Sequence, residues 1–375
     1  MSSLKADFLV IGAGIAGASI AYWLSRHARV TVLERESHAG YHSTGRSAAL
    51  YMASYGPPQV RALTCASRAF YDAPPAGFCE HALLSPRGAL AFARAGQEAE
   101  LDAHEALVRQ VSAIERLDRE QTLACIPVLK PDGLVGAVLE KDAADIDVDA
   151  LLQGFLRGAR ANGGNVVFDS QVQGLRRHDG QWLISTSQGE IAAKVVVNAA
   201  GAWADEVGRL AGARPIGLVP MRRSALLFAP PEGVKADRWP LFMDTGHSFY
   251  VKPDAGLLLG SPFNADPVAP HDVQAEELDI ATAIDVIQTQ TTMVVRRPKH
   301  VWAGLRSFVA DGELVGGYDP DVPGFFWAAG QGGYGIQTAP AAGMLYAALL
   351  RGEPVPDAVA AFPVDLAALS PKRLR

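Results

Sequence analysis

The stretch "DFLVIGAGIAGASIAYWLSRHARVTVLER", residues 7 to 35, carries the pattern that decides the fold. It consists of a buried β run, a segment with helical spacing and a second β run, which together predict one βαβ unit. Gly12, Gly14 and Gly17 form the pattern G-x-G-x-x-G directly after the first run, and Glu34 closes the second. In this context the pattern predicts binding of a dinucleotide, whereas the glycines alone would also fit a simple tight turn.

Each residue of this motif has a physical task in such a site. Gly12 permits the tight turn, Gly14 lets a pyrophosphate approach the backbone, and Gly17 lets the helix pack close to the sheet. The N-terminus of the helix then faces the anion with N–H groups that have no partner inside the helix. Glu34 can accept hydrogen bonds from both ribose hydroxyls. The motif does not distinguish NAD from FAD.

Composition and charge narrow the class of protein. The chain has 375 residues, of which 49% are hydrophobic and 20% charged, so we expect a large core and two domains. The formal net charge is −6 and no Lys/Arg-rich run is found, which argues against nucleic acid and favours small molecules as partners. Cys65, Cys79 and Cys125 are far apart, a spacing that supports neither a disulfide framework nor a metal site.

The hydropathy pattern bears on location. No apolar run reaches the roughly 20 residues that a membrane-spanning helix needs. The first residues, "MSSLKADFLVIGAGIAG", lack the basic region and cleavage site of a secretory signal. We therefore expect a cytoplasmic protein without an integral membrane segment. Peripheral contact with the inner membrane is compatible with the same sequence.

The rest of the chain predicts two interleaved domains and an α/β fold, α+β overall. Residues 214–302 differ from their surroundings, because they hold many prolines and short alternating strands around one amphipathic helix near 274–289. We expect a Rossmann-like dinucleotide-binding domain from residues 1–82, 143–213 and 303–375. A sheet-rich substrate domain then consists of residues 83–142 and 214–302.

Three further segments carry a resemblance to a known family. "STGRSAA" (43–49), "VVVNAAGAWADEV" (195–207) and "GQGGYGIQTAP" (330–340) resemble the glycine oxidase and D-amino acid oxidase superfamily of FAD enzymes. The chain is most similar to bacterial D-arginine dehydrogenases, whose "GYHSTGRSAA", "WAGLRSFVADG" and "QGGYGIQT" recur unchanged and whose "SFYLKPDAG" stands here as "SFYVKPDAG". The resemblance covers nearly the whole chain and implies a D-amino acid oxidase-like fold.

The resemblance also implies that FAD is bound without a covalent bond, since no His or Cys falls in the glycine-rich flavin segments. The FAD-binding residues that motif and resemblance indicate are Gly12, Gly14, Ile15, Ala16, Gly17, Glu34, Arg35, Ser43, Thr44, Arg46, Ser47, Ala48, Val172, Ala200, Gly201, Trp203, Gly304, Arg306, Gly332, Gly333, Tyr334, Gly335, Ile336, Gln337 and Thr338. A helix that begins near 334–337 would aim its N–H groups at flavin N1 and the C2 carbonyl. The alternative is a glycine-rich turn with no ligand.

Residues 39 to 58, "AGYHSTGRSAALYMASYGPP", combine many small residues with Leu50, Tyr51, Met52 and Tyr55, which an exposed loop would rarely keep. The resemblance implies that this segment lies against the isoalloxazine ring and continues as a mobile lid, with Tyr55 capping the substrate. A loop that packs on the core is the alternative interpretation.

A substrate carboxylate needs a cationic partner. Arg223 and Arg306 stand in apolar, strand-like contexts, where an unpaired guanidinium is costly and usually has an anionic partner. By resemblance they align with Tyr250 as the carboxylate-binding set, although a structural salt bridge is an alternative for either arginine. Gln337 and the carbonyl of Gly333 are candidates to contact the substrate amine or the flavin edge.

Together with these residues, the resemblance implies FAD-dependent oxidation of a D-amino acid to an imine by hydride transfer from Cα to flavin N5, after which water hydrolyses the imine to a 2-oxo acid and ammonia. A glycine or sarcosine oxidase-like oxidation of secondary amines is an alternative within the superfamily, and a flavin-binding protein without turnover is an alternative from another class. An NAD-dependent dehydrogenase is a weaker choice. The electron acceptor, a quinone or another carrier, stays open.

The substrate side chain is predicted from departures from the family pattern. Ala89 stands where the resemblance implies a glutamate facing a cationic side chain, and Leu50 stands where it implies a histidine. With Met52 beside them, these changes predict a preference for apolar D-amino acids over D-Arg. Glu80 or Asp244 would oppose this prediction if either carboxylate reached the pocket.

Overall fold

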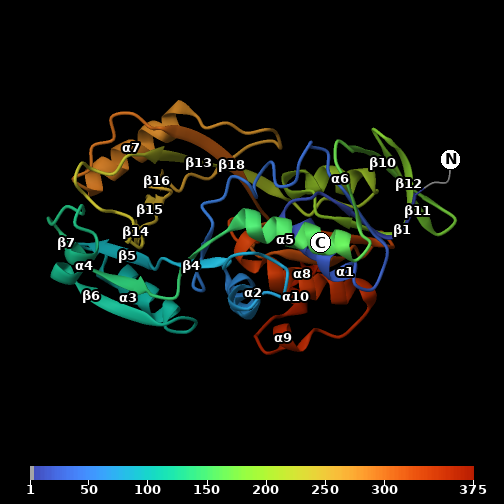
Figure 1. Ribbon diagram of the computed structural model, residues 1–375, viewed down its shortest axis with the longest axis horizontal. Coiled ribbons are helices and arrows are strands. Elements are labelled where there is room, and N and C mark those ends of the chain that lie inside the picture. Colours follow the sequence, from blue (N-terminus) through green and yellow to red (C-terminus); the bar gives the residue numbers. More distant parts are fainter. Residues whose placement is uncertain (1–3) are drawn as a thin grey trace.

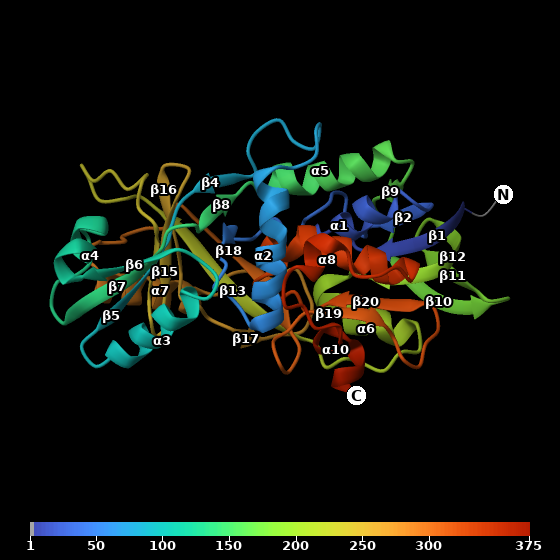
Figure 2. The same cartoon turned by 90° about the horizontal axis from the view of Figure 1, so that it is seen from below.

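The computed structural model describes residues 4 to 375, which fold into two halves lying side by side along the longest axis of the molecule (Figure 1). Within these residues the strands form three sheets, of eight, nine and three strands. The first sheet belongs to the half that holds the N-terminal strand, and the second sheet builds the other half (Figure 2). The predicted fold class, a Rossmann-like unit interleaved with a sheet-rich domain, is confirmed.

The first sheet contains the predicted βαβ unit. Its strands are β1 (Leu4–Ile11), β2 (Val30–Leu33), β9 (Asn165–Val167), β10 (Val172–His178), β11 (Gln181–Thr186), β12 (Gly189–Asn198), β19 (Val315–Tyr318) and β20 (Phe325–Ala329). Strands β12, β1, β2 and β9 run parallel in that order, and helix α1 (Ile15–Leu24) connects β1 to β2. The parallel strands therefore bring their carboxyl ends to one edge, beside the glycine motif.

Both faces of the first sheet are buried, because successive side chains of each strand point to opposite sides. Val10 packs in the cluster formed with α1 and α8 (Gly335–Arg351), whereas Leu9 packs in the cluster formed with α6 (Ala204–Leu210). Helices α1 and α8 approach closely at Gly343, where a Cβ atom would stand 1.9 Å from Ser19 Oγ. This contact couples the start of the chain to its end.

The second sheet is covered on one face and turns its other face toward the first half. Its strands are β5 (Ala89–Arg94), β6 (Ile114–Asp118), β7 (Leu134–Glu140), β13 (Val219–Phe228), β14 (Leu241–Asp244), β15 (Tyr250–Asp254), β16 (Leu257–Ser261), β17 (Asp266–Pro267) and β18 (His300–Phe308). The covered face packs Leu226, Phe228 and Phe242 against helix α7 (Glu277–Gln290). The opposite face carries residues that the site uses.

The remaining elements join the two halves or lie at their periphery. They are the three-stranded sheet of β3 (Leu50–Tyr51), β8 (Ala144–Ile146) and β4 (Leu84–Pro86), helices α2 (Pro58–Asp72), α3 (Glu98–Val108), α4 (Arg119–Cys125), α5 (Val148–Ala161), α9 (Asp357–Ala360) and α10 (Leu366–Leu369), and the 3-10 turns η1 (Gly201–Trp203) and η2 (Pro371–Leu374). The predicted domain boundary between 302 and 303 falls inside β18, which pairs with β13 along its whole length. The two strands act as one ribbon of the second sheet, and the domain boundaries stay a prediction.

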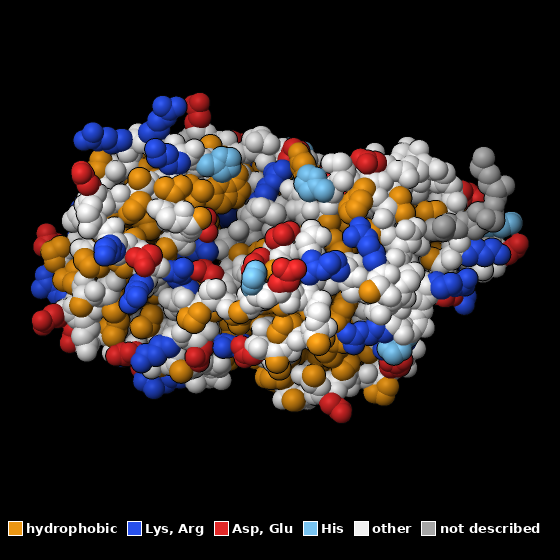
Figure 3. Space-filling model, in the orientation of Figure 1, with side chains coloured by type: hydrophobic (Ala, Val, Ile, Leu, Met, Phe, Trp, Pro, Cys, Tyr) orange, Lys and Arg blue, Asp and Glu red, His pale blue; other side chains and the backbone are white. Residues whose placement is uncertain are grey.

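The surface shows no large field of one charge on the face in Figure 3, where acidic and basic side chains alternate. A recess lies between the two halves on this face. No helix in the described part of the chain is long and apolar enough to cross a membrane. Among the same residues no group of His, Cys, Asp or Glu is placed to hold a metal ion.

Candidate active site

Three adjoining cavities run from the glycine motif to the open face of the second sheet. The motif cavity, of about 330 Å³, lies at the end of β1 and β2, and the arginine cavity, of about 80 Å³, lies against the second sheet. The middle cavity, of about 90 Å³, shares Gly14, Ser43 and Thr44 with the first and Ser47, Arg306 and Gly333 with the second. The three cavities therefore form one continuous path.

Most of the predicted site residues line this path. The motif cavity is lined by Gly12, Gly14, Glu34, Arg35, Ser43, Thr44, Val172, Ala200, Gly201 and Trp203. The middle cavity is lined by Gly14, Ile15, Ala16, Ser43, Thr44, Ser47, Gly201, Arg306, Gly332, Gly333, Gly335 and Ile336. The arginine cavity is lined by Ser47, Ala48, Leu50, Met52, Tyr55, Arg223, Tyr250, Arg306, Gly333, Ile336 and Gln337.

The other predicted residues lie just outside the path. Gly17 packs on the motif turn, Thr338 donates to the Tyr334 carbonyl, and Tyr334 packs its ring on Tyr55 at 4.9 Å between centroids. Arg46 bonds to the carbonyls of Val273 and Ala303, and Gly304 lies beside it. Ala89 is buried among lining residues such as Met52 and Met243 without lining the cavity itself.

The glycines of the motif are required by the backbone. Gly12 has φ +104°, and a Cβ there would stand 2.5 Å from the Ala199 carbonyl oxygen. A Cβ at Gly17 would stand 2.0 Å from the Gly12 carbonyl oxygen, so that only glycine lets α1 pack against the turn. Gly14 begins the helix without a side-chain cap, and the N–H of Ile15 donates to Thr44 Oγ1 at 3.1 Å. The turn thus leaves other N–H groups of α1 for a ligand.

Glu34 is held in place by the backbone while it lines the motif cavity. Its Oε2 accepts from the N–H of Ala13 at 2.8 Å and its Oε1 from the N–H of Glu36 at 3.0 Å. Each carboxylate oxygen keeps a further lone pair for a hydroxyl. Ser170 Oγ lines the same cavity, is buried, and has no hydrogen-bond partner among the described residues. Both groups suit a ligand with several hydroxyls.

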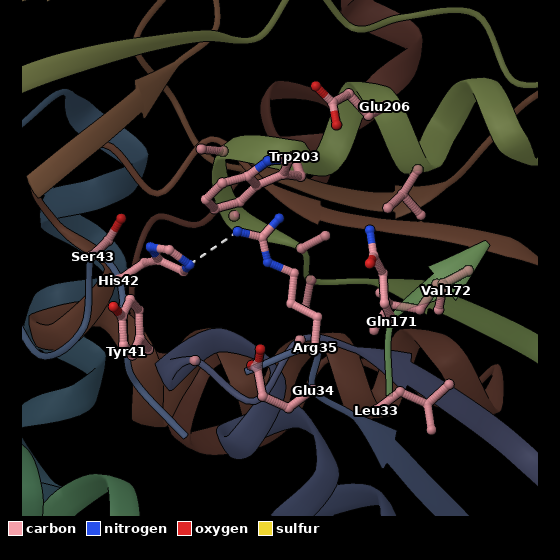
Figure 4. A pocket seen from close by; sticks show the side chains of 18 of the residues that line it. Leu33, Glu34, Arg35, Tyr41, His42, Ser43, Gln171, Val172, Trp203 and Glu206 are labelled. Carbon is pink, nitrogen blue, oxygen red and sulfur yellow. Dashed lines mark hydrogen bonds between the residues drawn. The ribbon is translucent and has the colours of Figure 1, made fainter. Parts of the chain in front are cut away.

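Trp203, Arg35 and His42 lie together on one side of the motif cavity (Figure 4). The Arg35 guanidinium lies 3.8 Å from the centre of the Trp203 ring, and the His42 ring lies 4.7 Å from it. His42 Nε2 is 3.2 Å from Arg35 Nη2 and 2.9 Å from Glu36 Oε1. Burial lowers the pKa of His42, which favours the neutral ring. The sequence alone indicates no role for His42, because a lone histidine carries no recognisable spacing.

The second glycine loop ends in the predicted helix N-terminus. Helix α8 begins at Gly335, and its N-cap Tyr334 makes no side-chain hydrogen bond to the first turn. Gly332, Gly333 and Gly335 line the middle cavity, so the first turn of this 17-residue helix opens toward that space. The partial positive charge of the helix end therefore favours an electron-rich group in the middle cavity.

Strand register brings together Arg223, Tyr250 and Arg306, the predicted carboxylate clamp. In the antiparallel pair β13 and β18, Met221 is opposite Arg306 and Arg223 is opposite Gly304, so both arginines point to one face of the second sheet. Tyr250 reaches the same face through β16 and lines the same cavity. Arg222, one residue away, points to the other side and pairs with Asp279 at 2.9 Å. Arg222 therefore forms a structural ion pair on one face of the sheet, whereas Arg223 and Arg306 face the cavity on the other.

Among the residues that the structure describes, Arg306 has no anionic partner. Burial lowers the pKa of Arg306, and the positive charge of the nearby Arg223 lowers it further, whereas Tyr250 and Tyr55 raise it. No carboxylate within residues 4 to 375 raises this pKa. Arg223 donates its Nε–H to the Asn264 carbonyl at 2.6 Å and lies 5.1 Å from the Phe263 ring centre. A guanidinium that is largely removed from water without a counter-ion is costly, so the cavity is suited to an anion that the described residues do not supply.

The expected lid segment is fixed at four positions by two side chains. Gln337 Oε1 accepts from the Met52 N–H at 3.3 Å, and its Nε2 donates to the Tyr55 carbonyl at 3.4 Å. Glu140 accepts from the N–H of Ala53 at 2.9 Å and from the Ser54 hydroxyl at 2.5 Å. The amide of Gln337, a predicted contact to the substrate amine, is therefore directed at the segment 52–55.

The apolar side of the arginine cavity contains residues that sequence reasoning missed. Leu241, Met243 and Phe263, together with Ala49, complete its lining. Leu241 and Met243 alternate along β14, a signal that marks one sheet face but does not tell which cavity that face meets. Glu80 is exposed, and Asp244 accepts hydrogen bonds from Ser248 and Phe249, so neither acid lines the cavity.

Comparison with known proteins matches this geometry to one family. A family model described as "DAO: FAD dependent oxidoreductase" matches residues 7–349. The chain is 25% identical over 388 residues to the sarcosine oxidase subunit beta of Rhizobium meliloti (strain 1021), with 96% of this chain and 88% of that subunit covered.

Two solved structures show the same fold. Glycine oxidase from Geobacillus kaustophilus superimposes with a TM-score of 0.84 at 22% identity, covering 98% of each chain. L-alpha-glycerophosphate oxidase from Mycoplasma pneumoniae with FAD bound superimposes with a TM-score of 0.82 at 17% identity, covering 92% of this chain and 95% of that one.

Proposed function

Because the chain belongs to the family of FAD-dependent oxidoreductases that matches residues 7–349, we propose that it oxidises the Cα–N bond of a small amino acid. The observation that carries this proposal is Arg306, a half-buried guanidinium that lines the cavity without a carboxylate partner among the described residues. A substrate carboxylate supplies the missing charge and matches the planar fork of an arginine.

FAD is the cofactor of this family, and the cavities offer the groups that such a molecule needs. In the proposed arrangement the motif cavity holds the adenosine end, with Glu34 and Ser170 directed at hydroxyl groups. The uncapped starts of α1 and α8 face the pyrophosphate and the flavin pyrimidine edge. When bound, FAD supplies the acceptor for the hydride that leaves the substrate Cα.

Replacing Glu34 with alanine is expected to weaken FAD binding by about 1 to 3 kcal/mol, because two charge-assisted hydrogen bonds are lost. FAD retention is measured by absorbance after dilution and ultrafiltration, with Glu190→Ala, at a surface carboxylate that pairs with Arg176, as the control. Substrate preference of the molecules that keep FAD is expected to be unchanged. A shift in that preference would show that the adenosine end has been misplaced.

The residues of the arginine cavity orient the substrate without supplying a strong base. Arg306 and Arg223 fix the carboxylate, and Tyr250 offers a hydroxyl on the same face of the sheet. Tyr55 excludes water from the opposite side, where it is packed on Tyr334. Such positioning lowers the barrier by holding one reactive conformer, provided that the substrate amine is neutral.

Two substrate classes remain, and each has its own support. Leu50, Met52, Leu241, Met243 and Phe263 line the cavity with no carboxylate among the lining residues, which favours a D-amino acid with an apolar side chain over D-Arg. The activity would then resemble D-arginine dehydrogenase with altered specificity. Similarity to a sarcosine oxidase subunit favours glycine or a secondary amine such as sarcosine instead.

Mixing the FAD-loaded protein with amines in the absence of oxygen is expected to bleach the flavin absorbance. The panel contains D-Leu, D-Phe, D-Arg, glycine, sarcosine and the L-enantiomers, and the rate of bleaching is measured for each. We expect D-Leu and D-Phe to react at least about tenfold faster than D-Arg, because desolvating an unpaired cation costs well above 1.4 kcal/mol. Faster reaction of sarcosine or glycine selects the second class, and no bleaching by any amine identifies a flavin-binding protein without turnover.

A further inference from the structure

A fourth cavity, the outer groove, shares a wall with the site but is not used by it. It has a volume of about 740 Å³ and contains Tyr41, Arg87, Lys252, His300 and Trp302 in its lining. Ser47, Ala48 and Ala49 line both the outer groove and the arginine cavity, and Ser47 also lines the middle cavity. One short segment of chain therefore borders all three spaces.

The shared wall is thin because its side chains are small. Ser47 Oγ accepts from the N–H of Ala49 at 3.0 Å, and Ala49 adopts the left-handed conformation with φ +55°. This tight local turn is closed by its own side chain and places no large residue between the cavities. A ligand in the outer groove is thus separated from the middle cavity by a single layer of backbone.

A pair of aromatic rings lines the outer groove, and one of them, Trp302, also packs against the buried cluster around Met52 and Tyr250. His300 and Trp302 lie stacked, with ring centroids 5.5 Å apart and planes 21° apart. Alternation along β18 points both to the face that also carries Arg306. His300 is exposed, and Trp302 is half-buried with its indole N–H donated to the Arg46 carbonyl at 3.2 Å. A free face of such a stacked pair can bind a planar molecule.

The polar part of the outer groove offers hydrogen-bond donors without net charge. Lys252 and Arg87 both bond to Asp145, at 2.8 Å and 2.7 Å, and Asp254 lies 3.8 Å from Lys252. Arg46, which also lines the groove, pairs with Asp272, so three cations face three carboxylates. The Lys252 side chain is only 5% exposed, and the compensated charges do not favour an anionic ligand. A neutral molecule with carbonyl oxygens fits such donors better.

We propose that the outer groove binds the electron acceptor of this oxidoreductase, a planar neutral carbonyl compound of the quinone class. Its ring stacks on Trp302 and His300, and its carbonyl groups face Lys252 and Arg87. The overall reaction balances: an amino acid loses its Cα–H and N–H hydrogens to become an imino acid, and the quinone gains two electrons and two protons to become a quinol. This inference rests on the proposed function in one respect: the electrons that reach the quinone come from the oxidation of the amino acid.

Binding is tested first, on oxidised FAD-loaded protein without any amine. Equilibrium dialysis measures the Kd of a water-soluble short-chain ubiquinone analogue. Trp302→Leu is expected to raise this Kd about tenfold, while Trp302→Phe, which also loses the indole N–H but keeps a ring, is expected to stay close to wild type. His300→Ala is expected to weaken binding, and His178→Ala, another exposed histidine on a strand, serves as its control.

Reoxidation is tested second, on FAD-loaded protein reduced by light, so that the substrate need not be known. Reoxidation by the quinone analogue is expected to slow about tenfold in Trp302→Leu, with reoxidation by O₂ unchanged. The inference is overturned if wild type neither binds nor is reoxidised by the quinone, if Trp302→Leu behaves as wild type, or if Trp302→Phe is impaired equally. It is also overturned if reoxidation by O₂ slows to the same extent. Failure of the amine panel alone would affect only the proposed function.

Discussion

Replacing Arg306 with alanine is expected to lower kcat/KM by a factor that corresponds to about 2 to 5 kcal/mol, the cost of truncating one side of a buried charge pair. The free protein holds this guanidinium without a carboxylate among its described residues, so the loss falls on the complex and not on the fold. Arg306→Ala and Arg306→Met are therefore expected to raise Tm or leave it unchanged. Lysine at this position keeps the charge but loses the planar fork, and it is expected to restore only part of the activity.

The neighbouring Arg222→Ala is the matched control, because Arg222 lies in the same sheet and points to the opposite face. Its partners include Asp279, whose side chain is 9% exposed, so this variant is expected to lose stability and keep the order of substrate preference. Steady-state kinetics, thermal unfolding and the FAD content of each variant provide the comparison. Wild-type KM and kcat in Arg306→Ala would remove the proposed clamp.

Replacing Glu140 with alanine is expected to have the second largest effect, on stability and on the segment 52–55. The variant leaves the N–H groups of Ala53 and Ser54 and the Ser54 hydroxyl without their acceptor. Each buried group without a partner costs about 1 to 3 kcal/mol, so a loss of several kcal/mol in the free energy of unfolding is expected. Hydrogen exchange at Ala53 and Ser54 reports the same loss locally.

Glu140→Gln separates the charge from the hydrogen bonds. Burial raises the pKa of Glu140 above its ordinary value, so the native state binds a proton more tightly than the unfolded chain does. The contribution of this carboxyl to stability is therefore fully present below the unfolded pKa and is lost as the pH rises through the native pKa. Glu140→Gln is expected to lack this pH dependence and to keep an acceptor for Ala53. Denaturant unfolding at several pH values measures the free energy of unfolding of both proteins. If this free energy changed equally with pH in the wild type and in Glu140→Gln, the pH dependence could not be attributed to Glu140.

The sequence predicts best what is local. The motif from Gly12 to Glu34 lies within one βαβ unit, and the steric reason for each glycine follows from the motif alone. Residue type and apolar context likewise predict the arginine clamp, although Arg222 and Arg223 differ only in the face to which they point. Strand alternation settles that choice once the partner strand is known.

The features that could not be predicted from the sequence depend on contacts between residues that are far apart along the chain. Glu140 and Gln337 hold the segment 52–55 from 87 and 285 positions away. Apolar residues in that segment predict that something covers it, but not that two polar side chains from different halves fix its backbone. Met243 and Leu241 likewise reach the cavity through sheet register, which no local pattern encodes.

The joining of α1 to α8 at Gly343 and Ser19 has a consequence for synthesis of the protein. A nascent chain makes the motif turn early, but the strand β20 and the helix α8 that cover it are translated only after the strands of the second sheet. The first half thus cannot finish folding while the ribosome is still adding residues 315–351, and the usual order of N-terminal domain first does not apply. Chains released before α8 would expose an apolar helix and an open sheet edge, which makes them natural targets for chaperones and proteases.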